Sequence, residues 1–538
     1  MRAGIQTLAL AIIAAACASV GTGLASDAAA QEPGASTPGD AVPLHGTLGE
    51  FSRTITTDSD SAQAYFDQGM RLAYSFARAD AARSFRAARR HDPDCAMCYW
   101  GEAWVLGPYQ NNPGGVGAYE DASRASREAR DRGEDAEPWE RTLIEAMAVR
   151  YPEGEEGPAA TEAYAEAMAE AAAAHGSDLD VGTLFAESIM MYRPWNLYRA
   201  DGEPHAETVE AIRVLEDVLA EDVSHPGACH LYIHAVEPWR PERAEACADL
   251  LAETVPGVAH MQHMPSHIYM NIGRYGDAVR ANQNARIVSQ RAELDGAFAP
   301  YPPHNTLMLA FAAWMDGQSG VALSAARDIA RERPEDRFHY ALLLARFGRW
   351  NRILDTDFGL DEPFQVAMGT FARGLALLKT GDPAGAGAAA ERIREIRDAT
   401  PEDAVYHFFQ HPQRDLLGLA ENILAGEIAA AQGRHGEAEE HLRRAVDLED
   451  GLVYSEPEPW PIPARHVLGA VLLEADQPEK AEDVYRESLD VHPENGWSLK
   501  GLTLSLAAQG RTFEAARLEP RFEAAWERAD IWLPGSRF

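Results

Sequence analysis

The sequence predicts an all-α protein, folded as a right-handed α-solenoid of antiparallel helix pairs. Alanine-rich stretches such as residues 159–174 favour helix, and no long run alternates apolar and polar residues with period two. A turn-forming residue followed by an alanine five positions later recurs along the chain. A chain of 538 residues is also too long for one compact core, so several domains or a linear array are expected.

The recurring pair of turn former and small residue indicates helical hairpins. The pairs are Gly273/Ala278, Gly317/Ala322, Gly348/Ile353, Gly381/Ala386, Gly433/Ala438, Asp476/Ala481 and Gly510/Ala515. The interval from Ala244 to Ala278 equals that from Ala481 to Ala515, as expected for a regular repeat. The turn former lets the chain reverse, and the small residue lets two helices approach closely. One hairpin cannot bury its apolar face alone, so neighbouring hairpins are expected to stack.

This spacing and these residue types resemble the tetratricopeptide repeat, whose period is about 34 residues. The resemblance runs from about residue 60 onward and is weaker between about 105 and 220. It implies a tetratricopeptide-like superhelix, with hairpins at 59–104, degenerate helical repeats at 105–220, histidine-rich repeats at 221–335 and C-terminal repeats at 336–538. A separate helical insertion is the alternative for 105–220. Such repeats serve many unrelated roles, so the fold alone implies no activity.

The first residues are typical of an export signal. Arg2 provides a positive end, residues 8–16 form a short apolar core, and small residues follow at 25–30. We therefore expect a signal peptide at 1–30, a flexible linker at 31–58, and a mature protein in the periplasm or outside the cell. Cys17 leaves a lipoprotein as the less favoured alternative. The apolar run is too short to span a bilayer, and no other stretch is long enough.

The charge balance excludes one class of partner. Lys and Arg number 48 against 84 Asp and Glu, which gives a formal net charge of −36. Such a surface repels phosphate backbones, so we expect no nucleic-acid partner.

Four cysteines remain after signal-peptide removal: Cys95, Cys98, Cys229 and Cys247. An even number in an oxidising compartment permits two disulfides. Cys229 and Cys247 are expected on neighbouring antiparallel helices, where a bridge would fit. For the pair Cys95 and Cys98, a structural disulfide is the first interpretation, reduced packing residues the second and redox catalysis the third.

Histidines crowd one part of the chain. Of the 18 in the sequence, these lie close together between positions 225 and 304: His225, His230, His234, His260, His263, His267 and His304. The segment from His230 to Glu237 places two imidazoles and a carboxylate at i, i+4 and i+7, which is one face of a helix. The segment His260-Met-Gln-His263-Met-Pro-Ser-His267 spaces three imidazoles by three and four residues, again on one face.

The tetratricopeptide frame implies that these side chains share one patch. Taking Ala278 as position 20 of its repeat puts His260, His263 and His267 at positions 2, 5 and 9. In the family, those first-helix positions line the concave ligand groove. In the neighbouring frames His304 and Glu237 also fall at groove positions, with His230 and His234 near the groove's edge. Tyr269 and Asn305 are added as ligand-groove candidates beside His260.

Pro265 lies inside the first helix of this frame. It cannot donate a hydrogen bond and leaves the carbonyl of Met261 without its helical partner. Two alternatives follow. Either the helix is kinked at Pro265, or it begins late and leaves His260 and His263 in the loop before it.

Neutral imidazoles with a carboxylate suit zinc, copper or non-haem iron. The candidate metal ligands are His230, His234, Glu237, His263, His267 and His304. An open position on such a metal would support a hydrolase or an oxidase. The motifs HExxH, GxSxG and a phosphate-binding loop are absent, so the common protease, esterase and nucleotide-binding classes are not indicated.

A narrower resemblance joins several of these motifs. The segments Cys95-Ala-Met-Cys98-Tyr-Trp-Gly101, His263-Met-Pro-Ser-His267-Ile-Tyr269, Pro303-His304-Asn305, Tyr454-Ser-Glu456-Pro457 and Asn495-Gly-Trp-Ser-Leu499 are similar to those of a group of exported bacterial tetratricopeptide-repeat proteins. The resemblance implies no particular reaction. The first interpretation is therefore a scaffold whose groove binds a peptide, protein or small ligand, and the alternative is a metal-dependent hydrolase or oxidase inside the solenoid. Residues 454–465 are expected to be a proline-stiffened connector that packs Trp460, with a lid as the alternative.

Overall fold

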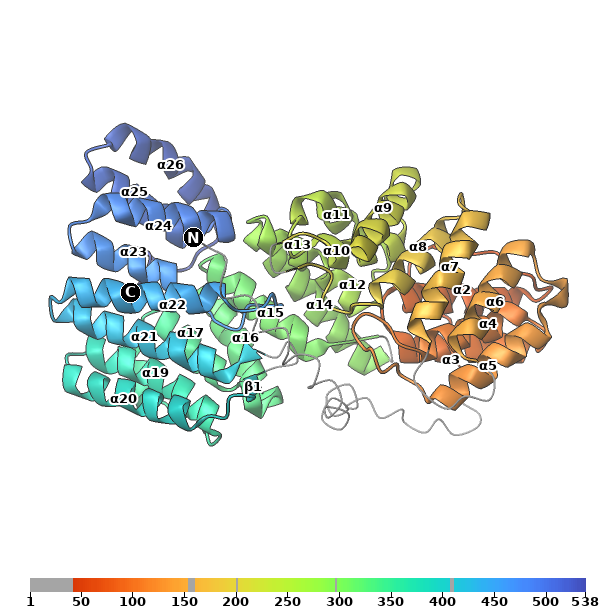
Figure 1. The fold of residues 1–538 in the computed structure, drawn as a ribbon, viewed down its shortest axis with the longest axis horizontal. Coiled ribbons are helices and arrows are strands. Elements are labelled where there is room, and N and C mark those ends of the chain that lie inside the picture. The colour runs from red at the N-terminus through yellow and green to blue at the C-terminus, as the bar shows by residue number, and fades with distance from the viewer. Residues whose placement is uncertain (1–41, 153–159, 200–201, 296–297, 407–410) are drawn as a thin grey trace, which may run out of the picture.

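The computed structural model describes residues 42–538 except 153–159, 200–201, 296–297 and 407–410. The expected signal peptide and the first part of the expected linker lie outside these residues. Within them, helical hairpins follow one another along the chain, from the N-terminal hairpins on the right of Figure 1 to the C-terminal hairpins on the left. The predicted all-α solenoid of paired helices is confirmed.

The helices of the N-terminal half have the following bounds. They are α2 (Asp60–Tyr74), α3 (Arg78–His91), α4 (Ala96–Leu106), α5 (Tyr119–Asp131), α6 (Pro138–Arg150), α7 (Thr161–Ala174), α8 (Leu179–Met190), α9 (Ala206–Glu221), α10 (Pro226–Val236), α11 (Glu245–Thr254), α12 (Ala259–His263), α13 (Pro265–Asn271) and α14 (Tyr275–Asp295). Short 3₁₀ turns lie at Gly133–Asp135 and Pro241–Ala244. Helices α4 to α9, in the region where the repeat pattern is weak, also pack each against the next.

The C-terminal half continues in the same way. Its helices are α15 (Pro302–Met315), α16 (Ser319–Glu332), α17 (Phe338–Arg346), α18 (Trp350–Asp355), α19 (Pro363–Lys379), α20 (Pro383–Ala399), α21 (Gln413–Ala431), α22 (His435–Asp450), α23 (Ala464–Glu474), α24 (Pro478–Val491), α25 (Gly496–Ala508) and α26 (Thr512–Ala525), with a 3₁₀ turn at Pro334–Asp336. Two short strands, β1 (Val405–Tyr406) and β2 (His411–Pro412), pair antiparallel between α20 and α21.

The turn pattern seen in the sequence has a direct structural counterpart. Every glycine of the predicted pairs has a positive φ, between 64° and 94°, and Asp476 has 57°. The residue five positions later is buried in every pair. It is fully buried at Ala278, Ala322, Ile353, Ala386, Ala438 and Ala481, and 6% exposed at Ala515. The left-handed residue reverses the chain, and the small side chain lets the second helix pack against the first.

Two glycines near the turn before α22 allow the effect of backbone strain to be measured without any steric crowding. A Cβ on Gly433 or on Gly436 would meet no atom within 4 Å, but only Gly433 has a positive φ, 73°. We expect Gly433→Ala to destabilise the protein by about 1–2 kcal/mol, the cost of a left-handed L-residue. Gly436→Ala, in the first turn of α22, should stabilise it by up to about 1 kcal/mol. Midpoints of urea unfolding for both variants measure the difference. Equal midpoints would contradict the strain at Gly433.

Residues 42–58, the second part of the expected linker, are packed and not flexible. Leu48 is fully buried, the Tyr65 hydroxyl donates to the carbonyl of Val42 (2.7 Å), and the Gly257 amide donates to the carbonyl of Thr47 (2.7 Å). The segment therefore bridges α2 and the turn before α12. The small and polar residues that suggested a linker continue past residue 42, but Leu48 and Ile55 provide apolar anchors.

The C-terminal end of the chain packs against hairpins that lie much earlier in the sequence. Arg528 pairs with Asp316 (2.7 Å), Asp530 accepts from the Ser319 amide (2.7 Å), and the Trp497 indole donates to the carbonyl of Trp314 (3.1 Å). These contacts join α25 and the residues after α26 to the ends of α15 and α16. The middle hairpins, which carry the histidines, are thus held from both ends of the chain.

Candidate metal centre

Helix α10 presents the first group of candidate ligands. His230 and His234 are one turn apart on this helix, and Glu237 follows as its C-terminal cap. Their exposed fractions are 0%, 3% and 1%, so the face that carries them points into the molecule. The ring centroids of the two imidazoles lie 5.1 Å apart, as the i, i+4 spacing predicts.

The second group lies on a helix that Pro265 interrupts. His260 and His263 belong to α12 and His267 to α13, with Met264 between them in helical conformation (φ −50°, ψ −38°). The alternative in which the helix begins late is therefore wrong, because His260 and His263 are helical and do not lie in a loop. All three imidazoles are buried.

The imidazoles converge in two groups of three, each with its ligand atoms within 4.8 Å of one another. The first trio consists of His230, His234 and His260, and the second of His263, His267 and His304. The Nε2 atoms of His230 and His260 are 3.1 Å apart, and those of His263 and His267 are 2.7 Å apart. The sequence predicted one shared patch, and the structure brings all six side chains together.

Two carboxylates lie against the imidazoles. Glu237 places Oε1 3.0 Å from His234 Nδ1 and Oε2 2.8 Å from His267 Nδ1. Glu456 places Oε2 2.7 Å from the same His267 Nδ1. His234, Glu237 and Glu456 form a further set whose ligand atoms lie within 4.8 Å.

The sequence pattern did not place Glu456 among the ligands. It comes from the connection 451–463 between α22 and α23, far along the chain from the histidines. Trp460 of this connection is buried against Phe371, as expected for the connector, with ring centroids 5.1 Å apart. A carboxylate within a run of four prolines was the available signal, because prolines hold such a loop in one conformation.

Acceptors outside the two trios fix the orientation of several rings. His230 Nδ1 lies 2.6 Å from the carbonyl oxygen of Tyr74, so it must donate and its Nε2 keeps a lone pair. His263 Nδ1 lies 2.7 Å from Asn282 Oδ1. Asn282 donates through Nδ2 to the carbonyl of Ala278 (2.9 Å), which turns its oxygen toward His263. Metal-binding histidines are commonly oriented by an acceptor on the second nitrogen in this way.

Burial keeps most of these rings neutral. It lowers the pKa of His230, His260 and His263 well below the usual value, and that of His234 to about 3, with neighbouring imidazoles adding to the effect. Burial also lowers the pKa of His267, but Glu456 and Glu237 outweigh it and raise this pKa to about 10. The pKa of Glu456 is raised by burial and by the charge of Glu237.

Three aromatic residues in the left-handed region form a wall beside the first trio. The ring of Phe76 lies 4.2 Å from that of His230, Trp195 lies 5.4 Å from His234, and Tyr301 lies 5.0 Å from His260, measured between centroids. Their φ angles are 56°, 62° and 60°. Phe76 occupies the turn between α2 and α3, five positions before the buried Ala81, where the later hairpins have glycine. Strain of this kind is retained where the surrounding structure requires the side chain.

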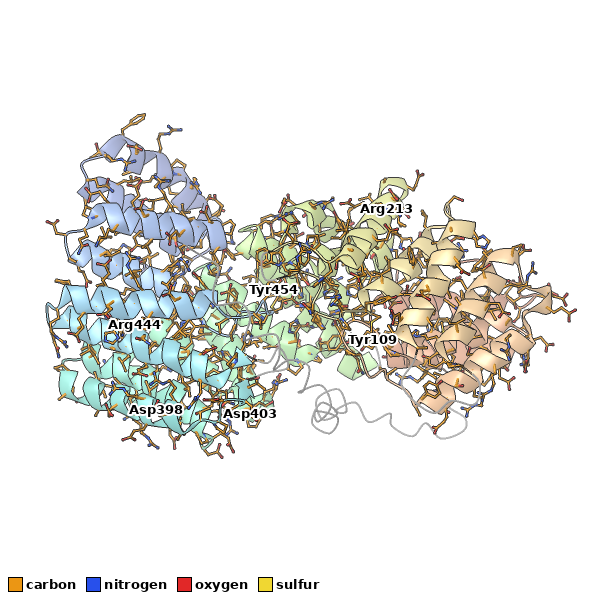
Figure 2. The ribbon with its side chains drawn as sticks, in the orientation of Figure 1. Tyr109, Arg213, Asp398, Asp403, Arg444 and Tyr454 are labelled. Atoms are coloured by element: carbon orange, nitrogen blue, oxygen red, sulfur yellow. A yellow bond between two sulfur atoms is a disulfide. The ribbon has the colours of Figure 1, made fainter. Side chains whose placement is uncertain are left out.

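A cavity reaches the centre from one side. His267 and Glu456 are part of its wall, together with Met270, Met308 and Phe311. Its volume is about 30 Å³, which is room for a molecule about as small as water. Tyr454, labelled near the middle of the molecule in Figure 2, also lines it, and its hydroxyl accepts from the Asn271 side chain (3.2 Å). A molecule about as small as water can therefore approach His267 of the second trio.

The remaining groove candidates have different positions. His260 belongs to the first trio. Tyr269 is not a groove residue, because its hydroxyl donates to Asp249 (2.8 Å) and its ring packs under Arg274. Tyr269 lies two residues after His267 on α13, so the helical period turns it away from the imidazoles and toward α11. Asn305 is fully buried beside His304 on α15, and its amide has no hydrogen-bond partner among the described residues.

The family model described as tetratricopeptide repeat matches residues 419–494, from α21 to just past α24. Residues 419–494 therefore match a tetratricopeptide repeat. No curated protein matches it. Similar solved structures include the crystal structure of the APC/C hetero-tetramer Cut9–Hcn1 (TM-score 0.28, 12% identity, 89% of this chain and 79% of that chain) and yeast Tom70 (TM-score 0.27, 12% identity, 87% and 92%). The likeness to exported bacterial proteins stays a prediction.

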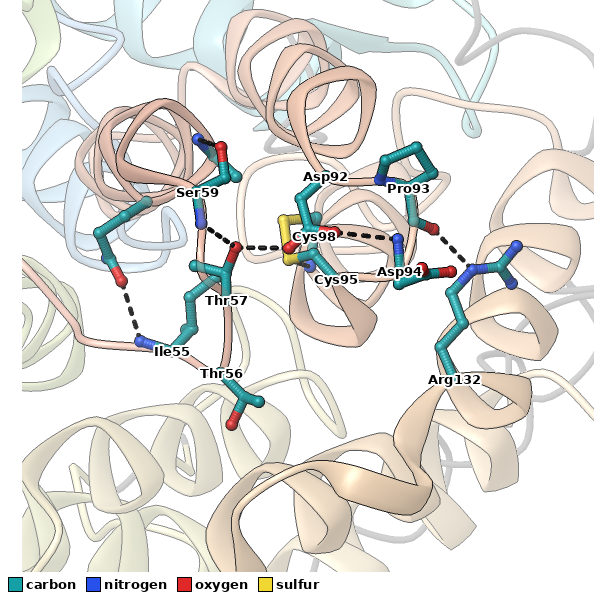
Figure 3. The surroundings of a disulfide bond; sticks show 12 residues. Ile55, Thr56, Thr57, Ser59, Asp92, Pro93, Asp94, Cys95, Cys98 and Arg132 are labelled. Carbon is teal, nitrogen blue, oxygen red and sulfur yellow. Dashed lines mark hydrogen bonds between the residues drawn. A yellow bond between two sulfur atoms is a disulfide. The ribbon is translucent and has the colours of Figure 1, made fainter.

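Both cysteine pairs are disulfide-bonded in this structure. Cys95 and Cys98 are buried at the start of α4, beside a turn in which Thr57 donates to Asp92 and Arg132 donates to the carbonyl of Pro93 (Figure 3). Their burial argues against redox catalysis, which needs an accessible sulfur. The bond from Cys229 to Cys247 ties α10 to α11, directly beside His230.

The two disulfides should differ in their contribution to stability. Cys229 and Cys247 are separated by 18 positions in the sequence, whereas Cys95 and Cys98 are separated by 3. A longer closed loop constrains the unfolded chain more. Replacing Cys229 and Cys247 by alanine should therefore cost about 3 kcal/mol, and replacing Cys95 and Cys98 about half as much. Thermal unfolding of the two double variants, without reductant, tests this order. A larger loss from the Cys95/Cys98 variant would contradict it.

Proposed function

We propose that this tetratricopeptide-repeat protein holds a catalytic transition-metal centre inside its solenoid. One observation carries the proposal: six imidazoles and two carboxylates, from α10, α12, α13, α15 and the connection 451–463, converge in one place, and all but His304 are buried. Buried groups of this kind are costly unless hydrogen bonds or a metal satisfy them.

Several imidazole nitrogens have no hydrogen-bond partner or face another lone pair, so a cation would satisfy them better than the neighbouring imidazoles do. His234 Nε2 and His260 Nδ1 are buried and have no hydrogen-bond partner among the described residues. Tyr74 and Asn282 hold two further rings so that each Nε2 lone pair is directed at another imidazole. Neutral imidazole is the form that binds metal, and zinc, copper and iron all accept such a donor set.

The number of donors and the cavity favour catalysis over a structural role. Structural zinc sites are closed by four ligands, whereas this centre has eight candidates and a solvent-connected wall. A bound metal supplies a Lewis acid for hydrolysis or, with copper or iron, a redox group for oxidation. The chain orients the imidazoles, limits access to small molecules, and places Glu456 at the cavity wall. Burial and the charge of Glu237 raise the pKa of Glu456 above its usual value.

Binding of a protein partner is the second function, and the matched repeats at 419–494 favour it. Tetratricopeptide-repeat proteins bind protein partners, and the partner here is unknown. The buried imidazoles are not part of such a binding surface. No helix in the described part of the chain is both long and apolar enough to cross a membrane. We also propose an oxidising location, periplasmic or secreted, with which the two disulfides and the expected signal peptide agree.

Metal analysis tests the proposal. The mature protein, purified without a polyhistidine tag, is expected to contain zinc, copper or iron at one or more ions per chain by elemental mass spectrometry. The His263→Ala/His267→Ala variant should lose most of this metal. His441→Ala is the control, because His441 bonds Asn422 on α21 and lies outside the two trios. Absence of metal after reconstitution with each ion, or equal metal in the double variant, would overturn the proposal.

A further inference from the structure

We propose that the centre binds two metal ions, one in each imidazole trio, and that Glu237 couples the two positions. The inference rests on the proposed function and specifies the number of ions and their ligands. It follows from how the six imidazoles are grouped, from which nitrogen each ring presents, and from the place of Glu237 between the groups.

The grouping separates the imidazoles into two sets. Close Nε2 contacts lie inside each trio, at 3.1 Å between His230 and His260 and at 2.7 Å between His263 and His267. The ligand atoms of each trio lie within 4.8 Å of one another, and among the described residues these two trios are the groups of three imidazoles that meet this limit. A zinc ion takes about four ligands, so one ion cannot engage six imidazoles. Three imidazoles per ion leave a further position open on each.

Three of the rings have a hydrogen-bond acceptor at Nδ1 and present Nε2 to the centre. The acceptors are the Tyr74 carbonyl for His230, Glu237 for His234 and Asn282 for His263. Nδ1 of a fourth ring, His267, lies 2.8 Å from Glu237 and 2.7 Å from Glu456. Nε2 of His234 is buried and lacks a hydrogen-bond partner among the described residues, so its lone pair is available. This common arrangement assigns Nε2 as the metal-binding atom and makes the carboxylates orienting groups.

Glu237 contacts both trios through separate oxygens. Its Oε1 lies against His234 of the first trio and its Oε2 against His267 of the second. Its charge therefore supports both positions, and its removal should affect both. Of the two, the second trio lies at the cavity through His267, while the first is covered by Phe76 and Tyr301.

The two positions make the site suitable for a small ligand that bridges two ions. The cavity limits the ligand to a small molecule, and its wall at Met270, Met308 and Phe311 is apolar. The ligand class we infer is a small neutral or anionic molecule with an oxygen or nitrogen donor, such as water, dioxygen or azide. A folded protein or a polymer cannot enter.

Stoichiometry tests the inference. Tag-free apoprotein titrated with Co²⁺ should reach its endpoint at two equivalents in the visible absorption, and elemental mass spectrometry after desalting should find two ions per chain. His260→Ala removes a ligand of the first trio and His304→Ala one of the second, so each should retain one ion. The combined variant should retain none. Adding azide to the two-ion form should change its spectrum, and His304→Ala should abolish that change.

His225 provides a matched control. It lies at the start of α10, accepts from the Ala228 amide and pairs with Asp180, outside both trios. Asparagine also caps helices, so His225→Asn should keep two ions. Glu237→Gln should keep two ions at saturation but weaken both by about 10- to 100-fold.

The possible outcomes are distinct. An endpoint at one equivalent, with all metal lost in either single variant, would show one ion held by both trios and overturn this inference while leaving the proposed function in place. No binding at all would overturn both. The wild-type endpoint decides between one and two ions even if a variant fails to fold.

Discussion

Asn282→Ala should weaken metal binding by about 10- to 100-fold without changing the number of ions bound at saturation, as expected for a group that orients a metal-binding histidine. Asn282 contacts no solvent, and its Oδ1 lies 2.7 Å from Nδ1 of His263. Without it, the ring can rotate or carry its proton on Nε2, where the metal should bind. Competition with a chromophoric chelator measures the affinity.

The chain contains a matched control for this variant. Asn422 on α21 donates to the carbonyl of Gly418 and presents Oδ1 to Nδ1 of His441 at 3.0 Å, the same arrangement as Ala278, Asn282 and His263. His441 is half-buried and belongs to neither trio. Asn422→Ala should therefore leave metal affinity unchanged. Equal losses in the two variants would indicate a general effect on the fold, and no loss in Asn282→Ala would contradict its orienting role.

Glu187→Gln should destabilise the N-terminal hairpins by about 3–5 kcal/mol, because it leaves a buried guanidinium without its counter-charge. Arg78 is 2% exposed and pairs with Glu187, whose second oxygen accepts from the Trp104 indole (2.7 Å). The guanidinium also stacks on Trp104 and Tyr109. Tyr109 is labelled beside the N-terminal hairpins in Figure 2. Hydrogen exchange of α3 and α8 measures this local stability.

Two comparisons isolate the cause of that loss. Glu210 pairs with Arg213, also labelled in Figure 2, at 2.8 Å on the exposed face of α9, and Glu210→Gln should change stability by less than about 1 kcal/mol. Replacing both buried partners, Arg78→Met with Glu187→Leu, should restore part of the stability because no charge is then left alone. If the double variant is less stable than Glu187→Gln, the pair is held by packing and not by charge.

Arg78 and Phe76 link the stability of the N-terminal hairpins to the proposed metal centre. Phe76 lies in the turn between α2 and α3 and contacts the imidazoles of the first trio, and Arg78 anchors the start of α3 directly after that turn. A change that loosens this turn should therefore reduce occupancy of the first trio before that of the second. The N-terminal hairpin is part of the wall of the centre, although the six imidazoles come from later hairpins.

The closed arrangement explains how a solenoid can carry a buried site. Repeats usually expose their concave face to a partner. Here the connection 451–463 brings Glu456 to His267, and residues near the C-terminus contact α15 and α16. These contacts cover the histidine-bearing hairpins with segments that lie far away along the chain.

Sequence by itself determined the features that depend on neighbours along the chain. The hairpin turns follow from Gly273, Gly433 and their equivalents, since backbone reversal needs a left-handed residue whatever lies around it. The common faces of His230 with His234, and of His260 with His263, follow from the helical period. The repeat frame then placed His304 near them, because stacked hairpins repeat their geometry. The all-α class, the hairpin turns and the common location of the six imidazoles could therefore be predicted from the sequence.

Tertiary structure alone decided which distant residues complete the centre. Glu456, Asn282 and Phe76 reach the imidazoles from other hairpins, and no local pattern encodes how far the superhelix curves or where a proline-rich connection turns. Burial, too, depends on the packing of the whole chain, and burial is what keeps His230, His260 and His263 neutral, the form that the proposed metal requires.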